Sequence, residues 1–539
     1  MRHWYEEPVE WIEGRWLHFR RVADQGLLES LDWTISIDRQ DRSCIVRHDL
    51  IFRPRGAIAA VLLALFGRPK LDRAMNEAGR TVGLWAAGQS DSPFPMQRRL
   101  PQATRGFLTD GAMRADGSDY GQGQVSRLVR WIAGAQTHDI APIRPLALAR
   151  MWNTSAADIV EILLAASAAG IVIKQWLLSC PQCTHDVSLH GHLKNVPASG
   201  QCAHCGATVA ADLARNVEIV FTMAPDLKGF PAGRFAGDEP ANQSGVHARV
   251  TVGARKRLIT KWQGVMGTVR VRVAGSGFET VAVTLDGSAP NLVIKDGCVA
   301  TAKARQESGA LEIVNQDAQP RRVDLGAMEQ KATGYPARQT LMLQAHRDIG
   351  GAELPPHGDA FVLEDVAVLA TDLAGLATRY RKSGDAQTFK EASDLLKETT
   401  EIVRGCGGSI ASRLGEAIVA LFANPGQALD AARQLAAHDR IAGRSAFRAS
   451  LDVGTVEMAT HRDRQVLRGA VVERAISIMR GLTAGELGLG AAAADSTAVI
   501  KSLQRLALEP VSDGTAGQTV RLSDRAPEDG TAGQSASAA

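Results

Sequence analysis

The stretch Val366–Phe422 decides the fold of the C-terminal part, through VAVLATDLAG at Val366–Gly375 and GGSIASRLGEAIVALF at Gly407–Phe422. The first segment predicts a buried strand that ends in Asp372, and the second predicts a β-hairpin joined at Leu414-Gly415. Between them, Asp385–Arg404 has the charged faces of a helix. Strands alternating with a helix, with a carboxylate at a strand end, predict an α+β domain with a place for a divalent metal ion.

The segment from about Val362 to Ala494 resembles the class III adenylate and guanylate cyclases in the order and spacing of its motifs. Asp372 in TDLAG matches the first metal-binding aspartate of that family, and Gly407-Gly408 with Leu414-Gly415-Glu416 matches its GG-x-x-x-K-x-x-GD hairpin. RASLDVG at Arg448–Gly454 is similar to the R-x-G-x-x-x-G strand. The resemblance implies a ferredoxin-like cyclase domain at residues 360–500. Upstream, the chain resembles bacterial cyclases with a long N-terminal region that contains a zinc ribbon.

The resemblance also implies a chemistry and a set of ligands. Class III cyclases convert a nucleoside triphosphate to a cyclic nucleotide and pyrophosphate, with two Mg²⁺ or Mn²⁺ ions held by two carboxylates. On this chain those carboxylates are Asp372 and Glu416, where the family has aspartate at the second position. The family's sites form at a head-to-tail dimer interface. A homodimer or heterodimer through the cyclase domain is therefore expected, with a nucleoside triphosphate as the ligand.

Several catalytic positions of the family are altered here. Ser412 replaces the purine-reading lysine and Val466 its partner aspartate, whereas Glu473 replaces the ribose-orienting asparagine and Ser477 the transition-state arginine. Losing one such group typically costs about 10²–10³-fold in rate. We expect a catalytically impaired pseudoenzyme that works as a regulatory or dimerisation module in cyclic-nucleotide signalling.

An active enzyme is the alternative reading, so the sequence leaves the chain's status as an enzyme open. It would be an adenylate cyclase that converts ATP to cyclic AMP and pyrophosphate. The missing groups would come from displaced side chains, such as Arg474 and Arg480, or from a heterodimer partner.

Two CxxC pairs, at Cys180 and Cys183 and at Cys202 and Cys205, lie eighteen residues apart. Each pair turns two thiolates toward one point, and two pairs complete a tetrahedron around Zn²⁺. Because four protein ligands leave no position for water, the site is predicted to be structural, in a zinc ribbon at residues 180–215. A disulfide pair and a redox CxxC are the rival interpretations.

The regions before the ribbon are predicted from their periodicity. Residues 1–84 read as strands followed by a helix, a helix-grip (START-like) outline whose interior is either packed or holds an apolar ligand. The apolar run Ala57–Phe66 is expected to be a core-facing helix. Residues 85–124 are rich in Gly, Ser, Pro and Asp, and predict a linker. Residues 125–179 have a winged-helix-like order, in which Ser155 is the expected N-cap of an acidic helix.

A second β-rich region and a low-complexity tail frame the cyclase-like segment. Residues 216–340 alternate strictly in places, as in GTVRVRV, and predict a small β-sandwich with hairpin turns at Asp286-Gly287 and Asp296-Gly297. The tail, residues 511–539, repeats DGTAGQ and carries few apolar side chains. It is expected to be disordered.

Composition excludes several classes of function. The 539 residues carry 61 basic and 58 acidic side chains, a net charge of +3, which demands neither a nucleic acid nor an anionic membrane. No run approaches the ~18 apolar residues of a membrane span, and the N-terminus does not resemble a signal peptide. A cytoplasmic multidomain α+β protein without a membrane partner is expected. A zinc-containing DNA-binding regulator is the third hypothesis, although the acidic helix at Ser155–Gly170 argues against it.

Overall fold

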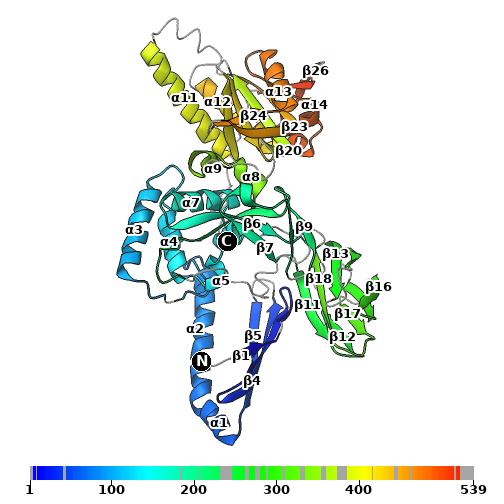
Figure 1. The fold of residues 1–539 in the computed structure, drawn as a ribbon. Helices are drawn as coiled ribbons and strands as arrows, with labels where there is room; N and C mark the ends of the chain where they lie inside the picture. Colours follow the sequence, from blue (N-terminus) through cyan, green and yellow to red (C-terminus); the bar gives the residue numbers. More distant parts are fainter. Residues whose placement is uncertain are drawn as a thin grey trace, which may run out of the picture. The chain divides into compact units, whose positions relative to one another are not determined.

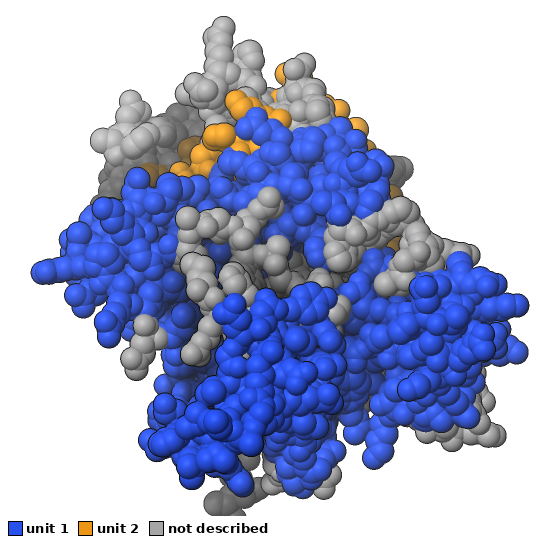
Figure 2. Space-filling view, turned by 60° about the horizontal axis from the view of Figure 1, so that its bottom comes forward, with its two compact units in different colours: residues 1–191, 195–337 blue, residues 192–194, 338–539 orange. Residues whose placement is uncertain are grey.

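The computed structural model describes the chain except for residues 1–3, 8, 41–43, 97, 182–184, 204–205, 231–245, 262–265, 274–279, 287–288, 306–309, 328–333, 352, 354–359, 373–384, 415–416, 442–446, 462–463, 515–516 and 523–539. Two compact units are present, residues 1–191 with 195–337, and residues 192–194 with 338–539 (Figure 2). Each unit combines helices with β-sheet, which confirms the predicted multidomain α+β class (Figure 1). Among the described helices, none has the length and apolar character that crossing a bilayer requires.

The N-terminal part has the predicted order of strands followed by helix. Its elements are β1 (Trp4–Glu6), β2 (Glu10–Ile12), β3 (Trp16–Ala23), β4 (Leu28–Arg39), β5 (Cys44–Pro54), α1 (Ala57–Leu62), the π-helix η1 (Leu63–Gly67) and α2 (Arg68–Ala86). The predicted packing of the helix against the strands is not seen for α2, because none of its side chains is buried. The expectation of a core-facing helix at Ala57–Phe66 is wrong, since only Ala59 is buried there. The neighbouring strand β5 lies at the sheet edge and is itself largely exposed, so it does not bury the apolar side chains of this run.

A helical segment and two short β-hairpins follow. The elements are α3 (Gln102–Asp116), α4 (Val125–Gly134), α5 (Thr137–Ile140), α6 (Pro145–Trp152), α7 (Ala156–Ala168), β6 (Val172–Ser179), β7 (Asp186–His190), the 3-10 helix η2 (Leu193–Asn195), β8 (Ser199–Gln201), β9 (Thr208–Ala210) and β10 (Val217–Met223). The linker predicted at 85–124 is wrong over α3, where Leu108 and Ala112 are buried. Gly111 also lies on the packed face of α3, where a Cβ would lie 3.3 Å from Ile171. A glycine in the sequence does not signal a buried helix face, so the helix was not predicted. Ser155 is the N-cap of α7 as predicted, accepting a hydrogen bond from the Asp158 amide.

Two facing sheets confirm the predicted β-sandwich. The remaining strands of this unit are β11 (Val246–Val252), β12 (Arg257–Lys261), β13 (Met266–Val273), β14 (Thr280–Asp286), β15 (Ala289–Lys295), β16 (Cys298–Arg305), β17 (Ala310–Asn315), β18 (Arg321–Ala327) and β19 (Tyr335–Pro336). One sheet has the order β14-β13-β18-β11 and continues through β2 into β3, β4 and β5; the other has the order β12-β17-β15-β16. Val250, Val271, Leu292 and Ile313 share the core between them. The hairpin predicted at Asp286-Gly287 is wrong, since β14 and β15 belong to different sheets. Gly287 itself lies outside the described residues.

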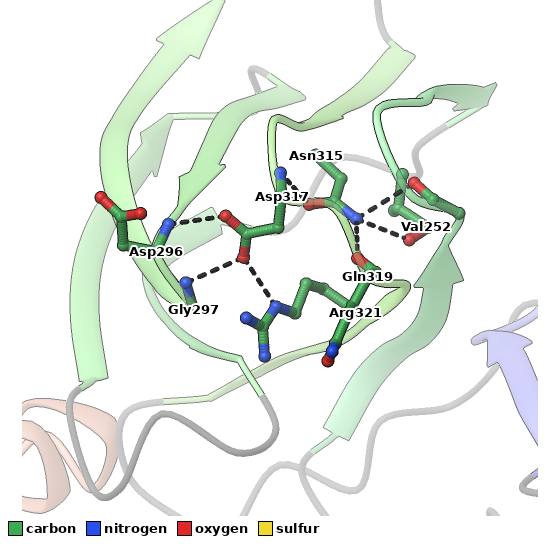
Figure 3. Close-up of polar contacts among 8 residues, drawn as sticks. Val252, Asp296, Gly297, Asn315, Asp317, Gln319 and Arg321 are labelled. Carbon is green, nitrogen blue, oxygen red and sulfur yellow. Dashed lines mark hydrogen bonds and ion pairs between the residues drawn. The ribbon is translucent and has the colours of Figure 1, made fainter.

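The turn at Asp296-Gly297 is confirmed as the hairpin between β15 and β16. Both residues have positive φ, 53° and 77°, which a two-residue hairpin turn of type I′ requires. The Asp317 carboxylate accepts hydrogen bonds from both turn amides and from Arg321 (Figure 3). Burial alone would raise the pKa of Asp317, but these hydrogen bonds and the Arg321 charge lower it. Nearby, the Asn315 amide donates to the carbonyls of residues 252, 253 and 319 (Figure 3).

Replacing Gly297 by alanine should therefore lower the free energy of unfolding of the sandwich by about 1 kcal/mol. The left-handed conformation is unfavourable for alanine, whereas glycine adopts it without strain. A Cβ at this position meets only ordinary contacts with Arg321, at 3.4 Å and beyond, so the backbone is the main cause. Urea unfolding followed by tryptophan fluorescence measures the change. The matched control is Gly297→Asn, which should lose less free energy of unfolding than Gly297→Ala, because asparagine tolerates positive φ. Equal losses for both variants would show that the backbone conformation is not the cause.

The second unit contains one large sheet. Its elements are α8 (Ala337–Leu341), α9 (Gln344–Ile349), β20 (Ala360–Asp372), α11 (Asp385–Gly405), β21 (Gly408–Leu414), β22 (Ala417–Phe422), α12 (Pro425–Ile441), β23 (Arg448–His461), β24 (Arg464–Arg468), α13 (Ala470–Arg480), β25 (Glu486–Leu489), α14 (Ala491–Ala494), α15 (Thr497–Arg505), β26 (Pro510–Gly514) and β27 (Gly517–Arg521). The sheet order is β21-β22-β20-β23-β25-β27-β26, with β24 beside β23. The predicted strand ending at Asp372, the helix at 385–404 and the hairpin at 408–422 are confirmed.

The start of the predicted disordered tail is wrong. Residues 510–521 form the hairpin β26–β27, and β27 pairs with β25. Val520 and Leu522 supply the reason, because both are buried in the core of this unit. In the first DGTAGQ copy, Asp513 and Gly514 end β26, and Gly517 and Gln518 begin β27. Residues 515–516 and the second copy lie outside the described residues.

Candidate functional site

The site is built where β20 and β23 lie side by side. Their antiparallel register pairs Asp372 with Arg448, Ala370 with Ser450 and Val368 with Asp452. Because side chains alternate along a strand, the three β23 residues Arg448, Ser450 and Asp452 lie on one face. The helix α13 lies against both strands (Figure 1). We call these three residues the polar column.

Asp372, the candidate metal ligand, forms an ion pair at one end of the polar column. Arg448 donates from Nε at 2.9 Å and from Nη2 at 2.5 Å, both to Oδ2 of Asp372. Its Nη1 donates to the carbonyl oxygens of Arg480 and Leu482 at the end of α13. The carboxylate is buried, with 8% of Asp372 exposed. A metal ion at this carboxylate would have to displace or tolerate a guanidinium cation that is itself held in place by two carbonyls.

The rest of the polar column bonds to α13 itself. Ser450 is fully buried, and its hydroxyl donates to the Ala475 carbonyl at 2.5 Å. Asp452 accepts a hydrogen bond from Nε of Arg474 at 2.8 Å. Gly490 makes room for this carboxylate, because a Cβ there would lie 2.2 Å from Oδ1 of Asp452. Arg474 is thus engaged by Asp452 rather than poised toward Asp372.

The altered catalytic positions are spread over other elements. Ser412 lies on β21 opposite Val419, and Val466 lies on β24 opposite Ala459. Glu473 and Ser477 are one helical turn apart on α13, and both are exposed. Glu416 lies outside the described residues. The structure therefore brings Asp372 together with Arg448, while Glu473 and Ser477 present an acid and a hydroxyl on the exposed side of α13.

Sequence reasoning missed Arg347, a half-buried cation of the same unit. Its Nε donates to the Ser409 hydroxyl at 3.0 Å, and its Nη2 lies 3.4 Å from Sδ of Met458. Loss of hydration lowers the pKa of Arg347 to about 10, although Asp348 nearby raises it. In the same helix, α9, Gln344 accepts a hydrogen bond from the Ile410 amide. Helix α9 is therefore part of the second unit, with hydrogen bonds to β21 and a contact to β23.

The first cysteine of each CxxC pair makes the same backbone hydrogen bond, to the carbonyl five residues later. The Cys180 amide donates to the His185 carbonyl, and the Cys202 amide donates to the Ala207 carbonyl, at 2.9 Å in each case. Cys180 and Cys202 are both buried, each 1% exposed. Cys183 and Cys205 lie outside the described residues.

The two hairpins also pack on each other. A Cβ at Gly200 of β8 would lie 2.8 Å from Val187 of β7 and 3.4 Å from Leu178 of β6. Cys180 follows Leu178 by two residues, and Cys202 follows Gly200 by two. The contact thus brings together the strands that lead to the two pairs. Buried thiols that follow two packed strands fit a structural Zn²⁺ site.

Comparison with known proteins gives one family match, to a family of unknown function (DUF5939), over residues 118–241. No curated protein matches the chain. The adenylyl cyclase CyaB from P. aeruginosa is 12% identical, with a TM-score of 0.28, over 32% of this chain and 98% of that chain. The guanylate cyclase domain of RhGC from Catenaria anguillulae, in complex with GTP, is 15% identical, with a TM-score of 0.26, over 30% of this chain and 96% of that chain. At these TM-scores the likenesses support no conclusion about this chain.

Proposed function

We propose that the C-terminal unit is a class III nucleotidyl cyclase-like domain that is catalytically impaired and works as a regulatory or dimerisation module in cyclic-nucleotide signalling. The observation that carries the proposal is that Glu473 and Ser477, both exposed on α13, stand where the family has an asparagine and an arginine. The ion pair between Asp372 and Arg448 accompanies this change, although Arg448 itself matches the arginine of the family's R-x-G-x-x-x-G strand. The family's chemistry needs the first carboxylate to hold a divalent cation. Here the carboxylate faces a guanidinium whose position is fixed by the end of α13.

The exposed face of α13 supports the same conclusion. In the family, an asparagine and an arginine from this helix act on the ribose and on the transition state. Glu473 and Ser477 occupy those positions, and the neighbouring Arg474 is bound to Asp452. Glu473 would repel a triphosphate, and Ser477 brings no positive charge to a transition state. The surface that binds substrate in active relatives is therefore free to serve a protein partner, and a second copy of the same domain is the partner proposed.

A cyclase assay on the full chain tests the proposal. Purified protein with ATP or GTP and Mg²⁺ or Mn²⁺ should form no more cyclic nucleotide than the Asp372→Ala variant does. The control is Asp430→Ala, which removes a carboxylate of the same unit that pairs with Arg505 at the surface and leaves the site intact. Robust turnover in the wild type and in Asp430→Ala, lost in Asp372→Ala, would overturn the proposal and establish an active cyclase.

The alternative is an adenylate cyclase completed by a heterodimer partner. It predicts that this chain alone is inactive and that turnover appears when a partner supplies lysine, asparagine and arginine. The same assay on a mixture with an active class III cyclase domain whose own carboxylates are mutated separates the two proposals. The DNA-binding hypothesis is weaker, because both sides of α7 are buried from Ile159 to Ala166. A helix in that position has no face with which to read a groove.

We also propose that Cys180, Cys183, Cys202 and Cys205 hold one structural Zn²⁺. The packed hairpins and the buried Cys180 and Cys202 support this role. The ion would hold the two short hairpins together. An isolated two-stranded hairpin has too small a core to be stable by itself.

A further inference from the structure

An apolar stripe runs along the helix that follows β5. Ile58, Val61, Leu62, Leu65 and Phe66 are exposed by 79%, 56%, 37%, 63% and 63%. Their spacing of three and four residues places the first four on one side of the helix. Ala59, the buried residue of α1, lies between them in sequence and on another side. This pattern is that of a packed amphipathic helix, yet here the apolar side faces solvent.

The helix is shaped to present the end of this stripe. Pro69 has no amide hydrogen, and its ring clashes with the carbonyl one turn earlier, which widens the helix before it. That widening is the π-helix η1, and it contains both Leu65 and Phe66. Figure 1 draws α1 and α2 as one continuous helical run that begins directly after β5.

The stripe has an apolar neighbour on the edge strand. Ile45, Val46, Ile51 and Phe52 of β5 are exposed by 50%, 48%, 62% and 38%. Of the twenty large apolar side chains that are exposed in the described part of the chain, these four and the five of the stripe make nine. We call residues 44–74 the apolar-basic segment. Side chains alternate along β5, so Ile45 and Ile51 lie on one face and Val46 and Phe52 on the other. The continuous exposed apolar surface is therefore the helical stripe, and such a surface marks an interaction site.

The charge of the apolar-basic segment is strongly positive. It contains Arg47, Arg53, Arg55, Arg68, Lys70 and Arg73 against Asp49 and Asp72, so its net charge is 6 − 2 = +4. The whole chain has a net charge of only +3, so the other residues together carry about −1. Arg68 and Lys70 directly follow Phe66 and Gly67 at the end of the stripe, and Arg53 and Arg55 precede Ile58 at its beginning. Cations therefore border the apolar side chains at both ends of the stripe.

We propose that the apolar-basic segment docks on an anionic lipid bilayer surface, with Ile58, Leu65 and Phe66 entering the interface and Arg53, Arg68 and Lys70 meeting lipid phosphates. This combination of apolar side chains and bordering cations is the one that binds amphipathic helices to anionic membranes. A second copy of this chain fits less well, because a two-fold contact would bring two +4 surfaces together. A small apolar ligand would need a concave, buried site, and the stripe is exposed. The helix would lie on the bilayer and not cross it.

Vesicle sedimentation tests this surface with the full chain. Wild-type protein should co-sediment with vesicles of phosphatidylcholine and phosphatidylglycerol, and should bind pure phosphatidylcholine vesicles far less. The double variant L65S/F66S should lower the partition coefficient at least about tenfold, through lost apolar burial. The triple variant R68Q/K70Q/R73Q should lower it on the order of 10²-fold, and added salt should weaken wild-type binding in the same way.

Exposed residues elsewhere in the same unit provide matched controls. Ile259→Ser removes a side chain that is 56% exposed on β12, and Arg215→Gln removes an exposed cation, and both should bind like the wild type. Circular dichroism should show all variants folded, because the substituted side chains are exposed. No binding to the anionic vesicles overturns the proposal. So does a dimer in sedimentation velocity that L65S/F66S dissociates while vesicle binding is absent, which would assign the surface to a second copy. Neither outcome depends on cyclase activity.

Discussion

Replacing Asp324 by asparagine should lower the free energy of unfolding of the N-terminal unit by about 3–5 kcal/mol, because it leaves a buried cation without its counter-ion. Arg249 is fully buried and binds Asp324 in bidentate fashion, at 2.8 Å and 3.0 Å, and Arg272 adds a bond at 2.9 Å. The register places these residues in one row across β11, β18 and β13, and Trp11 of β2 extends it, with its ring 4.8 Å from the Arg249 guanidinium.

Tryptophan fluorescence during urea unfolding measures this effect on the unit that contains it. All nine tryptophans lie at or before position 262, within the first unit. The control is Glu77→Gln, which breaks the Glu77–Arg80 pair on the exposed surface of α2 and should not change the unfolding midpoint measurably. If Asp324→Asn is as stable as Glu77→Gln, the buried row does not stabilise the sheet.

The same pair makes an acid-dependent contribution to stability. Burial alone would raise the pKa of Asp324, but hydrogen bonds and charges from Arg249 and Arg272 lower it below its ordinary value. A lowered pKa means that stabilisation is complete above the unfolded-state pKa of about 3.9 and is lost as the pH falls through the folded-state pKa. The stability difference between the wild type and Asp324→Asn should therefore be full at pH 7 and should narrow below about pH 4.

Replacing Cys180 by serine should remove the bound zinc and unfold the ribbon locally. Structural zinc sites in small domains have apparent binding free energies of about 10–16 kcal/mol, and serine is a poor zinc ligand. Elemental analysis of the wild type should give about one zinc per chain. Cys180→Ser and Cys202→Ser should each lose it, and limited proteolysis should then cut within residues 180–215.

An exposed cysteine provides the control for this experiment. Cys44 lies on β5 outside the ribbon, so Cys44→Ser should keep the full zinc content. Wild-type protein without zinc and with disulfide bonds at the CxxC pairs, detected as missing free thiols, would support the rival interpretation. Zinc that persists in Cys180→Ser would place the metal elsewhere.

Local patterns were sufficient for much of the C-terminal unit. The strand before Asp372, the hairpin at Gly408–Phe422 and the helices around it follow from hydrophobic periodicity and turn residues within each segment. The turn at Asp296-Gly297 follows from its residue types for the same reason. The zinc and metal ligands also came from short motifs, and they stay predictions.

Long-range contacts explain two of the wrong predictions that came from local sequence patterns. The apolar run Ala57–Phe66 has a core-like pattern, but no pattern within the run shows that β5 beside it is an exposed edge. The hairpin β26–β27 looked disordered, because its composition is polar and only Val520 and Leu522 reach the core. In both cases the outcome depends on which distant surface is available to bury a side chain.

The candidate site shows the same division. The residue types of Asp372, Glu473 and Ser477, on which the prediction of an altered catalytic set rests, can be read from the chain alone. The pairing of Asp372 with Arg448 cannot, because the two residues are 76 positions apart and meet only through the register of β20 and β23. Chemical identity is a local property of the sequence, whereas the charge that faces a carboxylate is set by strand pairing across the whole sheet.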